Sequence, residues 1–248
     1  MAKTSLKSIV FTVISVLSIL YTFSTMFKFI LFVSGNSSGL LDVAQVQHKV
    51  SASFIAQDLS LISIFIAVHS VLATASAREV FLYLGLNPIH RSVYNSISCF
   101  SLELLMKYWV LILPDIPLIW DKSDSSILVY VCQVFQALAW LCIFAVLYIL
   151  DFAEFIGAKQ VQYYVEDLGC PLLSKTAEAQ SVFKNMRHPV VSSFLIVLWC
   201  VPSMTIDRFI LASILTLYPL HMSNISDKDY AYVRDMYARK NYSMHRTP

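Results

Sequence analysis

A polar motif stands at the start of an apolar run late in the chain, where Arg187, His188 and Pro189 precede Val190. Proline favours the first turn of a helix, so Pro189 marks a predicted helix start. The free N–H groups and the dipole at such a start attract anions, and the Arg187 guanidinium can hold a carboxylate or a phosphate through two parallel hydrogen bonds. The motif therefore suits an anion site. An arginine that only anchors a helix among lipid headgroups has the same pattern, and on these residues alone the anchor is the simpler interpretation.

Three further polar motifs end or open apolar runs: His69-Ser70, then Arg91 with Tyr94 and Asn95, then Asp151 with Glu154 and Gln160. Asp151 and Glu154 share a helix face and could do acid–base chemistry, although an ion pair with Arg187 or Arg91 is the simpler prediction. His69 lies several residues inside its apolar run, where a polar group needs a hydrogen-bond partner. We predict that the four motifs share one cavity. Polar span ends that serve only as interfacial anchors are the alternative.

Metal binding and disulfide formation are not expected. No pair of histidines has the spacing of metal ligands on a helix, and no acidic residue is placed to complete a set. The five cysteines contain no Cys-x-x-Cys, so we interpret them as small buried hydrophobes. Glu103 and Lys107 lie four apart within one apolar run, and they are predicted to form a structural ion pair that lowers the cost of charge in lipid.

The elements that must position these residues are membrane helices. The chain has 248 residues, of which 57% are hydrophobic and 14% charged, whereas about a quarter of the residues in a soluble domain are charged. A membrane β-barrel is excluded, because its strands need short segments of alternating polarity and the chain has long apolar runs instead. Because a bilayer core takes about 20 apolar residues as a helix, we predict an all-α polytopic membrane helix bundle, a single domain over 1–248. The six expected spans are 9–33, 54–75, 93–113, 127–150, 190–204 and 209–222.

The last two predicted spans are short, so they form either two tilted helices or a hairpin that does not fully cross the membrane. With six spans both termini lie on one side, and thirteen of the 18 Lys and Arg residues fall there. Three (Lys49, Lys122 and Arg208) fall on the other side, and Lys28 and Lys107 lie within spans. Because basic residues favour the cytosolic side, we expect both termini to face the cytosol or the nucleoplasm.

The tail after the last span contains a helix signal. Ser226 and Asp229 form a capping box, which predicts an amphipathic cytosolic helix over 227–243. Tyr230, Val233 and Tyr237 line one face of that helix. The helix could lie on the membrane surface or fold back over the mouth of the predicted cavity.

The order of these motifs resembles a known family. An Arg187-His188-Pro189 motif, a membrane hairpin and an acidic, aromatic cytosolic helix are similar to the isoprenylcysteine carboxyl methyltransferase superfamily. In that superfamily, Arg-His-Pro-x-Tyr-x-Gly and a later Glu-Glu…Phe-Gly…Tyr segment enclose S-adenosylmethionine. His69-Ser70, Arg91-x-x-Tyr94-Asn95 and Asp151…Glu154…Gly157 narrow the resemblance to the branch of bacterial NnrU-type proteins, methanethiol methyltransferases and the nurim family. The chain most resembles the nurim family, which implies a multi-pass protein of the inner nuclear membrane, and the resemblance covers 55–243.

The resemblance implies a cofactor site made by Arg187, His188, Pro189, His69, Glu154, Asp229 and Tyr237. The chain departs from the superfamily pattern within this set. Val191 and Ser193 replace its Tyr and Gly, Asp229-Tyr230 stands for its Glu-Glu pair, and Ala238 replaces its later Gly. The loss of both glycines limits how closely a cofactor can approach the backbone, and the loss of a carboxylate removes hydrogen bonds that could orient it.

Two hypotheses follow from the resemblance and its departures. The first is a nurim-like protein of the inner nuclear membrane with a methyltransferase-like scaffold, no retained catalysis and no established cofactor. The alternative is an S-adenosylmethionine-dependent membrane methyltransferase for a small thiol or lipidic acceptor. There Arg187 would bind the cofactor carboxylate, and His188, His69 and Glu154 would line the site. A transporter is disfavoured, because no inverted repeat is visible. The expected partners are the lipid bilayer and nuclear envelope or lamina proteins, and no direct nucleic-acid binding is expected.

Overall fold

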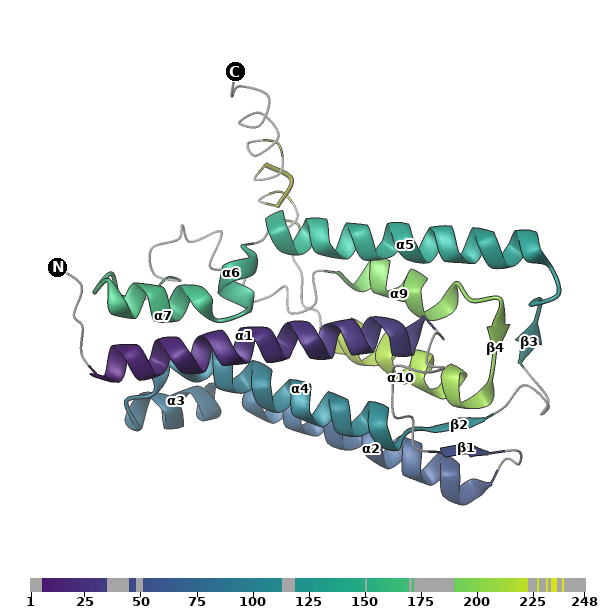
Figure 1. Cartoon of the computed structure of the whole chain (residues 1–248), viewed down its shortest axis with the longest axis horizontal. Helices are drawn as coiled ribbons and strands as arrows, with labels where there is room; N and C mark the ends of the chain where they lie inside the picture. The colour runs from purple at the N-terminus through teal and green to yellow at the C-terminus, as the bar shows by residue number, and fades with distance from the viewer. Residues whose placement is uncertain are drawn as a thin grey trace.

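The structure is a computed structural model that describes residues 6–34, 45–47, 51–112, 119–149, 151–169, 171 and 190–222, with 227, 231, 233–235 and 238 in the tail. Most described residues are helical, so the predicted all-α membrane bundle is confirmed. Helix α1 (Leu6–Val33) runs along the long axis of the bundle (Figure 1). Helix α5 (Ser126–Ile149) lies on one side of α1, and α2 (Ala52–Leu72) and α4 (His90–Tyr108) lie on the other.

The two ends of the bundle differ in their short elements (Figure 1). One end, which we call the α7 end, carries α3 (Ala75–Tyr83), the 3-10 helix η1 (Asn87–Ile89), α6 (Phe152–Phe155) and α7 (Ala158–Val165). The other, the strand end, carries β1 (Gln45–Gln47) parallel to β2 (Val110–Ile112), and β3 (Trp120–Asp121) antiparallel to β4 (Ser203–Met204). In the turn after β3, the backbone N–H of Ser123 donates to the Asp121 carboxylate at 2.9 Å and lowers the pKa of Asp121.

Helices α9 (Val191–Trp199) and α10 (Ile206–Met222) complete the bundle and are joined through β4. Helix α9 packs against α5, and α10 packs against α9 and α2. With 9 residues, α9 is about 14 Å long at 1.5 Å per residue, about half of a bilayer core. Side chains of α5 and β3 donate hydrogen bonds to the turn that follows α9. The Gln136 amide donates to the Cys200 carbonyl at 3.0 Å, and the Trp120 indole N–H donates to the Val201 carbonyl at 3.2 Å.

Among the described residues, α1, α2 and α5 are the helices long and apolar enough to cross a membrane. They overlap the predicted spans 9–33, 54–75 and 127–150, although α2 already ends at Leu72. The predicted third span is helical only to Tyr108, because the backbone becomes extended at Trp109 and the next three residues pair with β1. The count of six spans stays a prediction.

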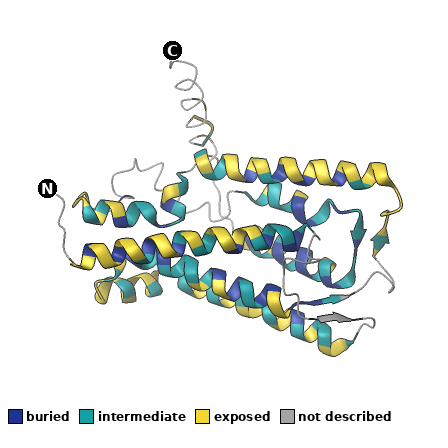
Figure 2. Ribbon diagram, viewed as in Figure 1, coloured by how far each residue is buried: buried dark blue, intermediate teal, exposed yellow. Residues whose placement is uncertain are grey.

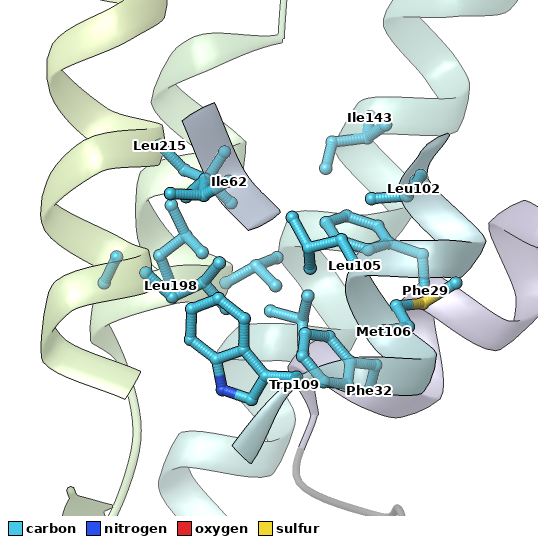
Figure 3. Packing of buried hydrophobic residues seen from close by; sticks show 14 of the residues in the cluster. Phe29, Phe32, Ile62, Leu102, Leu105, Met106, Trp109, Ile143, Leu198 and Leu215 are labelled. Carbon is cyan, nitrogen blue, oxygen red and sulfur yellow. The ribbon is translucent and has the colours of Figure 1, made fainter. Parts of the chain in front are cut away.

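A hydrophobic core joins the long helices (Figure 3). Trp109 is 1% exposed and meets the Phe32 ring edge-on, at a centroid separation of 6.2 Å. The outer faces of α1, from Leu6 to Phe27, and of α5 are instead exposed (Figure 2), and large apolar side chains such as Leu17 and Leu141 lie there. Soluble proteins rarely expose continuous apolar surface of this extent to water. The surface therefore suits the acyl chains of a bilayer.

Candidate functional site

Two of the predicted motifs meet directly in what we call the His69 cluster, made of His69, Ser70, Tyr94 and Tyr218. The Tyr94 hydroxyl lies 2.9 Å from Nε2 and 3.1 Å from Nδ1 of the His69 ring. The Ser70 and Tyr218 hydroxyls lie 2.9 Å apart, and the Tyr218 ring meets the His69 ring edge-on. The cluster therefore ties α2 to α4 and α10, and it gives His69 the partner that a polar group within an apolar run requires.

The Asp151–Glu154 motif reaches the same region through the turn between α6 and α7. The Arg91 guanidinium lies 5.8 Å from the centre of the Tyr94 ring, and the Glu154 carboxylate is near enough for its negative charge to act on Arg91. Glu154 is 4% exposed. The Asn95 amide donates to the Phe155 carbonyl at 3.1 Å. The structure thus brings three of the four predicted motifs together.

A glycine permits this close packing. Gly157 has φ +88°, a conformation that a residue with a Cβ rarely adopts. A Cβ at this position would lie 2.9 Å from Oγ and 3.0 Å from the backbone N of Ser92. The absence of a side chain therefore lets the α6–α7 turn rest against the first turn of α4.

The remaining members of the predicted site are placed differently. Asp151 forms an ion pair with Lys159 of α7, and the Gln160 amide donates to the Glu154 carbonyl at 3.3 Å. The fourth motif, Arg187-His188-Pro189, lies outside the described residues, as do Asp229 and Tyr237. Their place in the predicted cofactor site stays a prediction.

The predicted ion pair between Glu103 and Lys107 is wrong, because Glu103 pairs with Lys28 of α1 instead. The Glu103 carboxylate accepts hydrogen bonds from Lys28 at 2.7 Å, Tyr21 at 2.9 Å and Thr25 at 3.1 Å, all on α1. The three donors follow a spacing of four and three residues and so share one helix face, against which α4 packs. The Lys107 ammonium lies over the Tyr108 ring, 5.6 Å from its centre.

Curated relatives decide the family. The chain is 35% identical to human Nurim over 208 residues, which cover 82% of this chain and 78% of that protein. It is 36% identical to bovine Nurim over 193 residues, with 76% and 72% covered. It is 33% identical to Nurim of Xenopus laevis over 248 residues, with 94% and 86% covered.

The chain belongs to the nurim family. No protein-family model matches it, and no solved structure matches it. The nurim resemblance is therefore confirmed, and the wider methyltransferase superfamily stays a prediction.

This nurim-family chain also has a polar site at the strand end that the sequence did not predict. Asp58 of α2, 2% exposed, accepts the Val110 backbone N–H at 2.9 Å. The Trp109 indole N–H donates to Oδ2 of Asp207 at 3.3 Å, and the Arg208 guanidinium donates to the Val33 carbonyl. The position of Asp58 inside an apolar run could have indicated such a site, because a carboxyl in lipid needs a partner.

Proposed function

We propose that this nurim-family chain is a multi-pass protein of the inner nuclear membrane, with a methyltransferase-like scaffold that no longer catalyses. The bonding within the His69 cluster is the observation that carries the structural, non-catalytic part of the proposal. His69 is bonded to Tyr94, and Ser70 to Tyr218, so these side chains hold three helices together. Buried polar groups that satisfy one another stabilise a bundle, and the departures at Val191, Ser193 and Ala238 weaken the predicted cofactor site.

The location is proposed from the bundle and from the charge distribution. The exposed apolar faces of α1 and α5 fit a lipid bilayer, and the excess of Lys and Arg on one side favours termini in the nucleoplasm. Neither the Lys3/Lys7 end nor the tail from Ser226 contains a long basic cluster. Retention at the nuclear envelope therefore depends on the membrane bundle, through contacts with nuclear envelope or lamina proteins.

Fluorescence microscopy of fusions tests the location. The full chain should concentrate at the nuclear rim. A fusion of residues 223–248 to an unrelated single-span protein should spread through the endoplasmic reticulum and serves as the matched control. A full chain spread evenly through the endoplasmic reticulum would contradict the location, and rim enrichment of the tail fusion would place the signal in the tail.

A second candidate, an S-adenosylmethionine-dependent methyltransferase for a small thiol or lipidic acceptor, is favoured by one observation. Arg91 and Glu154 lie beside the His69 cluster, as the superfamily resemblance implies. In this proposal Arg187 binds the cofactor carboxylate, and His188, His69 and Glu154 line the site. The acceptor would form a bond to the methyl carbon as the bond from that carbon to the sulfonium sulfur breaks, so that the cofactor would leave as a neutral thioether and a thiol acceptor would lose its proton to solvent.

Titration calorimetry of the detergent-purified chain with S-adenosylmethionine separates the two proposals. We expect weak or no binding by the wild type. Tight binding that Arg187→Ala weakens at least about tenfold would replace the first proposal with the second, since a charge-assisted hydrogen bond contributes about 1.5–3 kcal/mol. Arg187→Lys is the matched variant, because lysine keeps the charge and loses the planar fork. No binding by the wild type together with a lower Tm in Arg187→Ala would identify Arg187 as a structural strut.

A further inference from the structure

The strand end contains a cavity that the proposed function does not use. Its volume is about 70 Å³. The described residues that line it come from the end of α1, from Trp109 and β2, and from the α9–α10 hairpin. Most of these side chains are apolar, and the polar ones are Thr205, Asp207 and Arg208. A cavity of this size with a charged wall has room for a small polar group.

Asp207 presents an unsatisfied oxygen in this cavity wall. Its side chain is 3% exposed, and Oδ2 accepts the Trp109 indole N–H. Among the described residues no donor has the geometry of a full hydrogen bond to the buried Oδ1, although the Thr205 hydroxyl and the backbone N–H groups of Asp207 and Arg208 interact with the carboxylate. A buried carboxylate oxygen without a donor is costly. A ligand with a hydrogen-bond donor would remove that cost.

Over the residues that the structure describes, the charges around the cavity do not balance. Asp58 lies close enough to Asp207 for the two carboxylates to repel each other. Arg208 is the neighbouring cation, and its guanidinium is bonded to the Val33 carbonyl. Among these described groups, two carboxylates and one guanidinium leave one negative charge in a low-dielectric environment, where an unpaired charge is expensive. A bound cation, or a proton on one carboxyl, restores neutrality.

The lining restricts which cation fits. A divalent metal needs several oxygen ligands, and among the described residues no group of three or more His, Cys, Asp or Glu is placed to hold one. An ammonium group needs one carboxylate, and the aromatic rings of Trp109 and Phe32 are among the lining residues, where rings of this kind attract cations. Figure 3 shows the Trp109 ring at the edge of the core, with its indole nitrogen pointing away from Ile62 and Leu215.

We propose that the cavity binds a primary ammonium group, with Asp207 as its acceptor. The N–H groups of the ligand donate to Oδ1, and its methylenes contact the apolar lining. A trimethylammonium group has no N–H to donate, so the site selects primary amines over choline. The amine comes either from the headgroup of a phosphatidylethanolamine or from a small soluble amine.

Two arms of one experiment separate these sources. In the first, the full chain is purified in detergent with equal amounts of phosphatidylethanolamine and phosphatidylcholine, and native mass spectrometry measures the lipid that stays bound. In the second, the Tm of the chain in phosphatidylcholine nanodiscs is measured with free ethanolamine or free choline at equal ionic strength. We expect at least about a tenfold preference for the primary amine in one arm. Preference in the first arm identifies a lipid, and preference only in the second identifies a soluble amine.

Asp207→Asn should abolish the preference, because the amide keeps the shape and loses the charge. Asp121→Asn is the matched control, since Asp121 is an exposed carboxylate at the same end and should leave the preference unchanged. Equal binding of primary and trimethylated amines by the wild type overturns the proposal, whether or not the variant folds. So does a preference that Asp207→Asn retains. A Tm that depends on pH but on neither amine would show that a proton balances the charge, and it would also overturn the proposal.

Discussion

Replacement of Glu103 tests how α4 is held against α1. Interhelical hydrogen bonds in membrane proteins contribute about 0.6 kcal/mol on average and up to about 1.7 kcal/mol. Glu103 accepts three such bonds, from Tyr21, Thr25 and Lys28, so Glu103→Ala should lower the free energy of unfolding by about 2–5 kcal/mol. Glu103→Gln keeps a hydrogen-bond acceptor and loses only the ionic part of the interaction free energy with Lys28. That part is worth up to about 1 kcal/mol, because the Lys28 side chain is 44% exposed.

The assay is reversible unfolding of the detergent-purified chain in mixed micelles with increasing SDS. A double-mutant cycle between Glu103→Gln and Lys28→Ala should give a coupling free energy of about 0.5–1 kcal/mol. The matched cycle with Lys107→Ala should give none, because the Lys107 ammonium lies over the Tyr108 ring. Stronger coupling of Glu103 to Lys107 than to Lys28 would refute this assignment.

Three further predictions concern packing, the His69 cluster and orientation. Gly157→Ala should lower the free energy of unfolding by about 1–3 kcal/mol more than Gly85→Ala, because a Cβ at Gly157 meets Ser92 and one at Gly85 meets nothing within 4 Å; equal losses would contradict the close contact. Tyr94→Phe should lose about 1 kcal/mol of unfolding free energy by the same SDS assay, whereas Tyr130→Phe, on an exposed face of α5, should lose none. An unchanged stability of Tyr94→Phe would show that the bond to His69 does not stabilise the bundle. Epitope tags at both termini should be digested by protease added outside sealed microsomes, and protection of either tag would rule out an even number of spans with cytosolic ends.

Several features could be predicted from local patterns. Long apolar runs identified α1, α2 and α5, because about 20 apolar residues suffice for a span. That His69 has a hydrogen-bond partner followed from the need of polar groups in apolar runs for partners, and its partner Tyr94 belongs to one of the motifs that were expected to lie close to it. The end of α4 was not predictable, since an apolar run such as Val110–Ile112 is compatible with helix or strand. The pairing of these three residues with β1 makes them a strand and ends α4.

The partners of charged and hydroxyl groups depended on packing between distant segments. Lys28 and Lys107 both lie in apolar runs, and only the placement of α1 beside α4 brings Lys28 to Glu103. Tyr218 was missed because a tyrosine in an apolar run has the pattern of a core residue. Its hydroxyl bonds to Ser70, which lies 148 positions away.

The turn after α9 has a consequence for the order in which the chain enters the membrane during synthesis. Over the described residues, α9 is too short for the insertion machinery to recognise as a span by itself. The carbonyls of Cys200 and Val201 accept hydrogen bonds from Gln136 of α5 and Trp120 of β3, both of which leave the ribosome earlier. We therefore expect the α9–α10 hairpin to insert as one unit, with α5 and β3 already in place as its template.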